Sequence, residues 1–152
     1  MIDPSEKLKV IKDTLEGMDI NLGDKLFDEI RSALSILKEV VPGDARQVYT
    51  MEQRLISISD EISYAMMIIN KQRLDMENKL RNGMKGEVTM LTRQGRPSME
   101  SIRMEIFWKH EDLSELNDNL QFIINLINYL NSIRESLNQY VFLLRDISKA
   151  NY

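Results

Sequence analysis

The stretch VYTMEQRLISISDEISYAMMIINKQRLDM, Val48 to Met76, decides the fold of this chain. Its seam positions are spaced alternately three and four residues apart over four heptads: Val48, Met51, Leu55, Ile58, Ile62, Ala65, Ile69, Gln72 and Met76. This spacing places them on one face of a helix and is typical of a coiled coil. At about 1.5 Å per residue, a helix over 44–82 would be roughly 58 Å long and needs a partner of similar length.

The C-terminal third contains a suitable partner helix. The same spacing recurs there, at Leu113, Leu116, Leu120, Ile123, Ile127, Leu130, Arg134, Leu137, Val141 and Leu144. The two stretches therefore predict an all-α fold built on a long antiparallel helical hairpin. Arg134 is a charge within the second seam, and it needs a partner there because an unpaired buried charge is costly.

The first 43 residues predict two short helices. Asp3-Pro4-Ser5-Glu6 has an N-cap residue, a proline at the first helical position and an acidic partner, which is a helix-start pattern. A second apolar stripe begins at Leu26 and stops at Pro42-Gly43. We expect two parts: short acidic N-terminal helices over 1–43, and the helical hairpin with its tip and its C-terminal helix over 44–152.

The tip of the hairpin is expected between Gly83 and Trp108. Residues 83–98 contain three glycines and a proline, which disfavour a helix interior and predict a loop or hairpin. Ile102, Met104 and Ile106 alternate with polar residues, as in a β-strand. A small β-hairpin at the tip is therefore one expected arrangement.

The expected C-terminal helix has another apolar stripe, which runs along it beside the seam. Its members are seven residues apart: Leu126, Ile133, Tyr140 and Ile147. One partner helix cannot cover both stripes, which favours a homo-oligomer assembled through these residues. The alternative is that the helices of 1–43 fold back over this stripe.

Composition excludes several classes of function. The chain of 152 residues has no Cys and one His, so thiolate metal sites, disulfides and Cys- or His-based nucleophilic relays are excluded. His110 beside Glu111, Asp112 and Glu115 indicates a capping or solvated cluster rather than a metal site. No apolar stretch approaches the roughly 20 residues of a membrane span, and the first residues lack a signal-peptide layout. We expect a soluble, cytoplasmic, non-enzymatic protein with no catalytic residue, metal or cofactor.

Charge is distributed unevenly along the chain. Residues 1–70 carry 8 basic and 13 acidic side chains, residues 71–109 carry 9 and 5, and residues 110–152 carry 3 and 6. The middle segment is therefore a basic island between two acidic arms, although such an island can also be a solvated face without a ligand. Phosphate contacts by Lys and Arg would give salt-dependent, sequence-independent binding of a nucleic acid. The candidate DNA-binding residues are Lys71, Arg73, Lys79, Arg81, Lys85, Arg93 and Arg96.

Two segments of the chain resemble a known family. Lys71-Gln72-Arg73-Leu74-Asp75 resembles a Lys-x-Arg-Leu-Asp segment near the end of that family's first long helix, and a Gly-containing basic turn follows at 83–86. LNQYVFLLRDI, residues 137–147, is similar to its late-helix pattern. The family is the recombination mediator proteins of T-even-type bacteriophages, and the resemblance covers 48–147. The chain departs from the family at Met76-Glu77, at Tyr140 and over 148–152.

The resemblance implies a function and a set of partners. It implies a ring of six or seven subunits that binds single-stranded DNA without catalysis. Its implied role is DNA recombination and repair, by helping to load a RecA-like recombinase onto DNA covered by single-strand-binding protein, in the host cell cytoplasm if the protein is phage-encoded. The alternative function is a structural or chaperone-like coiled-coil protein, similar in outline to prefoldin subunits, that binds protein clients and not DNA.

Overall fold

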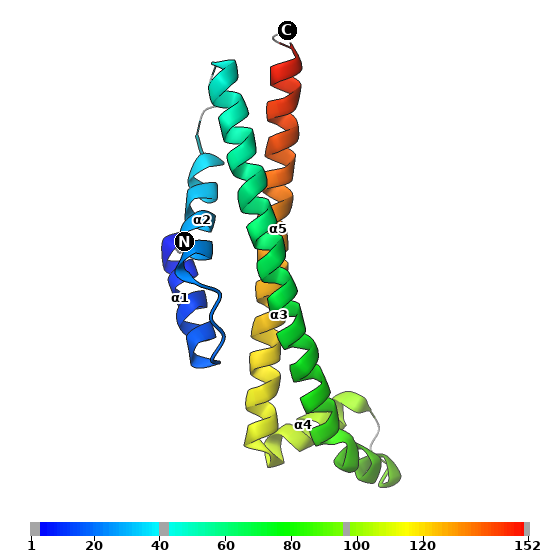
Figure 1. Cartoon of the computed structure of the whole chain (residues 1–152). Coiled ribbons are helices and arrows are strands. Elements are labelled where there is room, and N and C mark those ends of the chain that lie inside the picture. Colours follow the sequence, from blue (N-terminus) through cyan, green and yellow to red (C-terminus); the bar gives the residue numbers. More distant parts are fainter. Residues whose placement is uncertain (1–3, 40–42, 96–97, 151–152) are drawn as a thin grey trace. The chain divides into compact units, whose positions relative to one another are not determined.

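The computed structural model describes residues 4–39, 43–95 and 98–150, and every regular element in these ranges is a helix (Figure 1). The helices are α1 (Pro4–Gly17), α2 (Asp24–Ile36), α3 (Ala45–Arg93), α4 (Met99–Lys109) and α5 (Glu111–Ala150). The predicted all-α class is confirmed. The chain divides into two compact units, unit 1 (Met1–Ile68 with Asn128–Tyr152) and unit 2 (Ile69–Ile127), so α3 and α5 each contribute to both.

Helix α3 begins where the sequence supplies a cap. The Asp44 carboxylate accepts a hydrogen bond of 3.0 Å from the backbone N–H of Arg46, and the Asp44 carbonyl accepts one from Val48. This arrangement satisfies N–H groups in the first turn that have no partner within the helix. The predicted start of the long helix at Asp44 therefore has a local physical cause.

In unit 1, α3 and α5 pack against each other in antiparallel directions. Three polar contacts join them, from Glu52 to Arg145 at 2.7 Å, from Ser59 to Asn138 at 3.2 Å and from Ser63 to Arg134 at 3.2 Å. The numbering rises along α3 as it falls along α5, so the two helix segments run in opposite directions. The apolar seam between them is buried, at Val48, Leu55, Ile58, Ile62, Ala65, Leu130, Leu137, Val141 and Leu144.

The predicted charge in the seam, Arg134, has hydrogen-bond partners. Its guanidinium donates to Asn131 Oδ1 at 2.7 Å as well as to Ser63 Oγ. These acceptors lower the cost of its partial burial. Because the Ser63 partner lies on α3, the contact also favours one register of the two helices.

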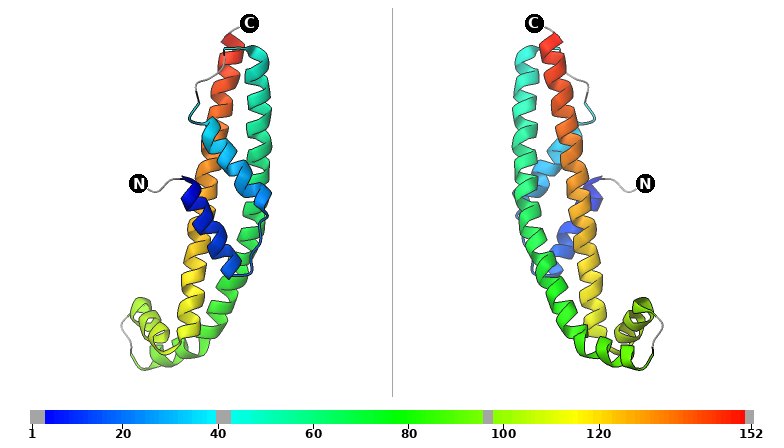
Figure 2. Two further views of the ribbon diagram at one scale, coloured as in Figure 1. Left: turned by 90° about the vertical axis from the view of Figure 1, so that its left-hand side faces the viewer. Right: turned by 90° about the vertical axis from the view of Figure 1, so that its right-hand side faces the viewer.

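Helices α1 and α2 lie across one face of the α3–α5 pair in unit 1 (Figure 2). Lys25 of α2 forms a 3.0 Å ion pair with Glu61 of α3, and this pairing raises the pKa of Lys25. On α1, Lys7 Nζ lies 4.3 Å from the centre of the Tyr129 ring on α5. These contacts surround an apolar interface, whose buried N-terminal members include Leu8, Leu15, Leu26, Phe27 and Ile30.

Unit 2 is formed by the end of α3, by α4 and by the start of α5. Its buried cluster consists of Met84 and Leu91 from α3 with Ile102 and Ile106 from α4. Partly buried side chains surround this cluster, namely Leu80, Val88, Phe107 and Leu113. Unit 2 therefore has its own apolar core.

The prediction of a loop or β-hairpin from residue 83 is wrong over the described residues, because α3 continues through Gly83 and Gly86 to Arg93. A Cβ on Gly83 would lie 2.7 Å from Leu113 Cδ2, so this glycine permits close approach of α5. Each helical glycine costs about 1 kcal/mol relative to alanine. Burial of Met84 and Leu91 in the following turns outweighs that cost.

The predicted strand at 102–106 is also wrong, since these residues lie in α4. Ser98 caps this helix, its Oγ accepting a 3.2 Å hydrogen bond from the backbone N–H of Ser101. Ile102 and Ile106 are buried and four residues apart, whereas Met104 is 68% exposed. The interval of four residues between Ile102 and Ile106 therefore defines the buried face of α4, and the alternation of apolar and polar residues over 102–106 does not.

We expect Gly86→Ala to stabilise the protein by about 0.5–1 kcal/mol, because alanine has the higher helix propensity. Nothing lies within 4 Å of a Cβ built on Gly86, so the methyl group meets no neighbour. The matched change Gly83→Ala should stabilise less, because its methyl group displaces Leu113. Urea unfolding followed by circular dichroism measures both changes, and equal stabilisation would contradict the close approach at Gly83.

Candidate nucleic-acid interface

Five of the predicted DNA-binding side chains lie exposed on α3 in unit 2, namely Lys71, Lys79, Arg81, Lys85 and Arg93. Their positions follow from helix geometry, because they fall outside the seam face that Ile69, Met84 and Leu91 bury. Arg81 and Lys85 are four residues apart, so they lie on adjacent turns of the same face. None of the five forms an ion pair within the described ranges of the chain.

The two remaining predicted residues differ from these five. Arg73 is half buried and is already engaged, with 2.9 Å contacts to Glu77 Oε1 and Asn70 Oδ1. An ion pair spaced four residues apart on a helix contributes only about 0.3–0.5 kcal/mol, so a phosphate can compete for Arg73. Arg96 lies outside the described residues.

A groove of about 620 Å³ opens beside these cations in unit 2, between α3, α4 and α5. Its charged lining is Arg81, Lys85 and Glu77 from α3 with Arg103 from α4. Its remaining lining is largely apolar, with Leu80, Met84, Val88, Met99, Phe107, Leu120 and Ile124 beside Thr89, Asn117 and Gln121. The groove thus combines an apolar floor with three cations.

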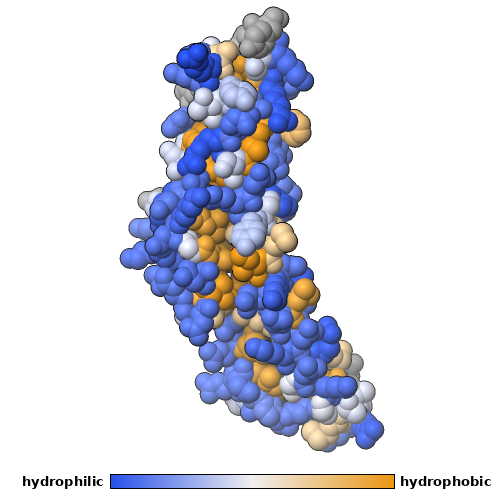
Figure 3. All heavy atoms as spheres, viewed as in Figure 1, coloured by the Kyte–Doolittle hydropathy of each residue, from blue (hydrophilic) through white to orange (hydrophobic). Residues whose placement is uncertain are grey.

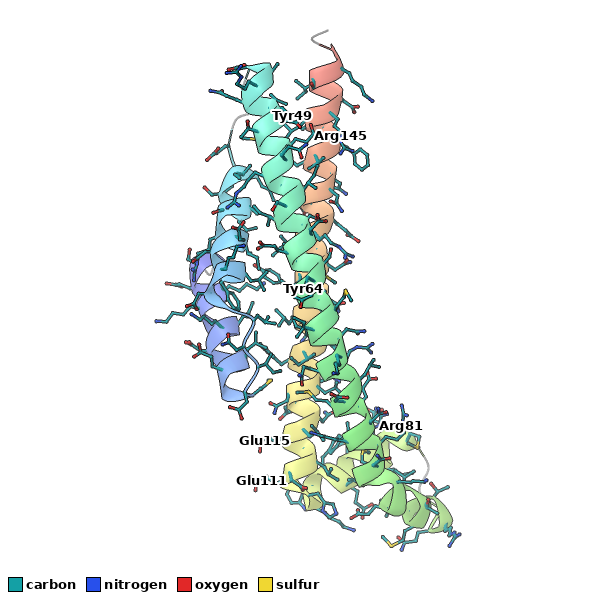
Figure 4. The ribbon with its side chains drawn as sticks, viewed as in Figure 1. Tyr49, Tyr64, Arg81, Glu111, Glu115 and Arg145 are labelled. Atoms are coloured by element: carbon teal, nitrogen blue, oxygen red, sulfur yellow. The ribbon has the colours of Figure 1, made fainter. Side chains whose placement is uncertain are left out.

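The acidic side chains at the start of α5 lie outside the groove. Glu111, Asp112, Glu115 and Asp118 are exposed, and none of them lines the groove. In the view of Figure 4, Glu111 and Glu115 lie on the opposite side of unit 2 from Arg81. The positive groove and the acidic stripe of α5 therefore occupy different faces of this unit.

The four residues of the predicted oligomerisation stripe differ in exposure. Leu126 and Ile133 are buried within the single chain, at 4% and 5% exposure. Tyr140 and Ile147 are half buried. Phe142 and Leu143, which lie between these two in sequence, are exposed on α5. The C-terminal part of α5 in unit 1 therefore presents more apolar surface than its middle.

The sequence indicates Arg103 as part of the basic island and Phe107 as an aromatic residue available for stacking, but the expected strand at 102–106 does not place the two side by side in a groove. A signal was present in the sequence. Ser98 is a good N-cap residue, and apolar residues follow it at positions 102 and 106 with helical spacing. A helix assigned from Ser98 would have placed Arg103 and Phe107 four residues apart on one face.

A second hollow lies in unit 1, where α2 and the preceding loop meet α3. It has a volume of about 630 Å³, and apolar atoms reach the surface there (Figure 3). Its charged lining residues are Lys25, Asp60 and Glu61, and Lys25 is already paired with Glu61. The net charge of this lining is negative, so it is a poorer candidate for a polyanion than the groove of unit 2.

Comparison with known proteins yields no relative: no family model, curated protein or solved structure matches this chain. The likeness to recombination mediators therefore stays a prediction from sequence segments. Over the residues that the structure describes, no helix combines the length and apolar character that crossing a membrane requires. In the same ranges, no three acidic, His or Cys side chains gather into a potential metal site.

Proposed function

We propose that this protein binds single-stranded DNA without catalysis and acts as a recombination mediator. The observation that carries the DNA-binding proposal is the set of five exposed cations on one helix of unit 2, Lys71, Lys79, Arg81, Lys85 and Arg93, none of which has an ion-pair partner in the described part of the chain. Cations of this kind contact phosphates and release counterions from the strand. The recombination role rests on the sequence resemblance alone.

The proposed assembly is a homo-oligomer in which α3 and α5 form one long helical hairpin in each subunit. The C-terminal part of α5 supports this proposal, since exposed Leu143 lies one turn from each of half-buried Tyr140 and Ile147, and Phe142 is exposed as well. Several copies of these five cations would then bind one strand, and the effective concentration of each successive site would be high. Such an oligomer could weaken the hold of single-strand-binding protein and present the strand to a RecA-like recombinase.

Removing two cations from α3 tests the proposed DNA binding. We expect Lys71→Ala with Arg73→Ala to lower the affinity for labelled oligo(dT) about tenfold at low salt. The slope of log affinity against log salt should also fall by about 1.4, because each phosphate contact on a single strand contributes about 0.7. Fluorescence anisotropy at several salt concentrations measures both quantities, and light scattering on the same samples gives the oligomer mass.

The matched control removes two exposed cations from the other unit. Lys9→Ala with Lys38→Ala makes the same change in net charge, and neither residue forms an ion pair among the described residues. This control should retain the affinity and the slope. An equal loss in both double variants would mean that net charge, and not a site on α3, governs binding.

The second candidate function is that of a coiled-coil protein that holds protein clients. The exposed side chains of Phe142 and Leu143 favour this alternative, because neighbouring apolar side chains on a surface helix suit a protein partner. Absence of oligo(dT) binding at low salt would support it against the DNA-binding proposal. Capture of a client that depends on Phe142 and Leu143 would then identify the surface.

A further inference from the structure

We propose that the groove of unit 2 is a subsite for the bases of single-stranded DNA, with Arg81, Lys85 and Arg103 holding the adjacent phosphates. This inference rests on the proposed DNA binding. It adds a specific position, the groove, where part of the strand would bind beyond the surface of α3. The groove is built by three helices that meet over the core of unit 2. Its volume of about 620 Å³ falls within the usual range of small-ligand sites, roughly 300–1,000 Å³.

The first argument is the charge of the groove. Arg81, Lys85 and Arg103 form no ion pair among the described residues, so their charges are available to a ligand. The acid in the lining, Glu77, is paired with Arg73 at 2.9 Å. The residues that α5 contributes are neutral. The groove is therefore complementary to an anion.

The second argument is the floor of the groove. Phe107 lines the groove and packs against the core cluster, so its ring is held in place while one side remains accessible. Met84 and Met99 add polarizable sulfur beside it. Aromatic rings stack with nucleic-acid bases irrespective of base identity, as a sequence-independent DNA-binding protein requires.

The third argument is the extent of the cationic surface. An acidic protein segment would also suit three cations over an apolar floor. However, exposed Lys71 also lies on α3 outside the groove and shares its side of the helix with Lys85, whereas Lys79, two residues before Arg81, points away from the groove. Positive charge that extends beyond the groove, at Lys71, favours a polyanion that enters the groove from the surface of α3. We therefore infer a nucleic-acid strand as the occupant.

The experiment compares two probes, labelled oligo(dT) and an abasic oligonucleotide of equal length. Arg81→Ala with Arg103→Ala should weaken the binding of both probes about tenfold and lower the salt slope by about 1.4, because both probes carry the same phosphates. Phe107→Leu keeps an apolar side chain against the core. It should weaken oligo(dT) about fivefold or more and leave the abasic probe unchanged, because only the former has bases to stack.

Controls separate the groove from the rest of the protein. The Lys9→Ala, Lys38→Ala protein should bind both probes as the unmodified protein does. Thermal unfolding by circular dichroism tests whether each variant is folded, and Lys85→Ala, a change at an exposed residue, provides an independent test of the phosphate contacts. It should lower the salt slope by about 0.7.

Several outcomes would overturn the inference. If the groove variants bind oligo(dT) normally while Lys71→Ala with Arg73→Ala weakens binding, the strand stays on α3 and the groove is not a subsite. Equal losses for both probes in Phe107→Leu would exclude base stacking. An acidic amphipathic peptide serves as a third probe. If the groove variants bind both oligonucleotides normally but lose binding to this peptide, the groove is a protein-docking site. If the unmodified protein binds neither probe, the proposed function and the groove assignment both fail.

Discussion

Replacing Ile62 with alanine is expected to lower the free energy of unfolding by about 3 kcal/mol. Ile62 is fully buried in the seam between α3 and α5 of unit 1, near the contact of Ser63 with Arg134. Truncation removes apolar contacts and leaves a cavity between two helices that close only partly around it, and such changes cost about 2–5 kcal/mol. Urea unfolding followed by far-ultraviolet circular dichroism measures the loss.

The control for Ile62→Ala is a similar truncation on the same helix. Met67 is 71% exposed, so Met67→Ala should change the free energy of unfolding by less than about 0.5 kcal/mol. Similar effects at both positions would contradict the placement of the seam. A difference of about 3 kcal/mol would support it.

Ile106→Ala is expected to have an effect of similar size in unit 2, about 3 kcal/mol. Ile106 is fully buried in the cluster that also contains Met84, Leu91 and Ile102, and it attaches α4 to the end of α3. The loss of this attachment should also increase amide hydrogen exchange in α4, since local opening requires fewer buried contacts to break. Hydrogen exchange with mass spectrometry reports the loss by segment, and urea unfolding reports it for the whole chain.

The matched variant Met104→Ala distinguishes the helix from a strand. In a strand, Ile102, Met104 and Ile106 would point to one face, and all three would contribute to the core. In α4, Met104 lies opposite the buried pair and is exposed, so Met104→Ala should be nearly neutral. A large loss of stability in Met104→Ala would contradict the helix.

The long helices could be predicted from the sequence because their signal is periodic and local. The seam positions from Val48 to Ile69 repeat with helical spacing, and most of them are buried in the structure. Asp44 supplies a cap that sequence alone identifies as a starting point. The N-terminal pattern likewise indicates two short helices, which the structure has as α1 and α2, although Asp3, the predicted cap, lies outside the described residues.

The tip could not be predicted in the same way, because its structure depends on contacts between distant residues. Gly83 reads as a helix breaker until Leu113, thirty residues later, is seen to occupy the space that a side chain would fill. Ile102, Met104 and Ile106 satisfy a strand pattern as well as a helix pattern over five residues. Only the burial of Ile102 and Ile106 against Met84 and Leu91 decides between the two.

The candidate site, too, could be predicted only in part, because some of its features are local in sequence and others depend on contacts between helices. The cations of α3 were identifiable from the excess of basic residues over 71–109, and their exposure follows from the position of the seam. The groove was not identifiable, since it needs Arg81, Arg103 and Gln121 from three helices. The pairing of Arg73 with Glu77 was visible in the sequence as a spacing of four, but the added contact with Asn70 was not.

The division of the chain into units has a consequence for the order in which the protein folds. Unit 2 is a single continuous segment, Ile69–Ile127, whereas unit 1 joins two segments that flank it in sequence. The hydrogen bond from Ser59 to Asn138 spans 79 residues of chain, and contacts of such long range slow folding. During synthesis, unit 2 can therefore be complete while the first half of unit 1 still awaits the end of α5. A nascent chain at that stage exposes the apolar seam of α3, which is when it most needs protection from aggregation.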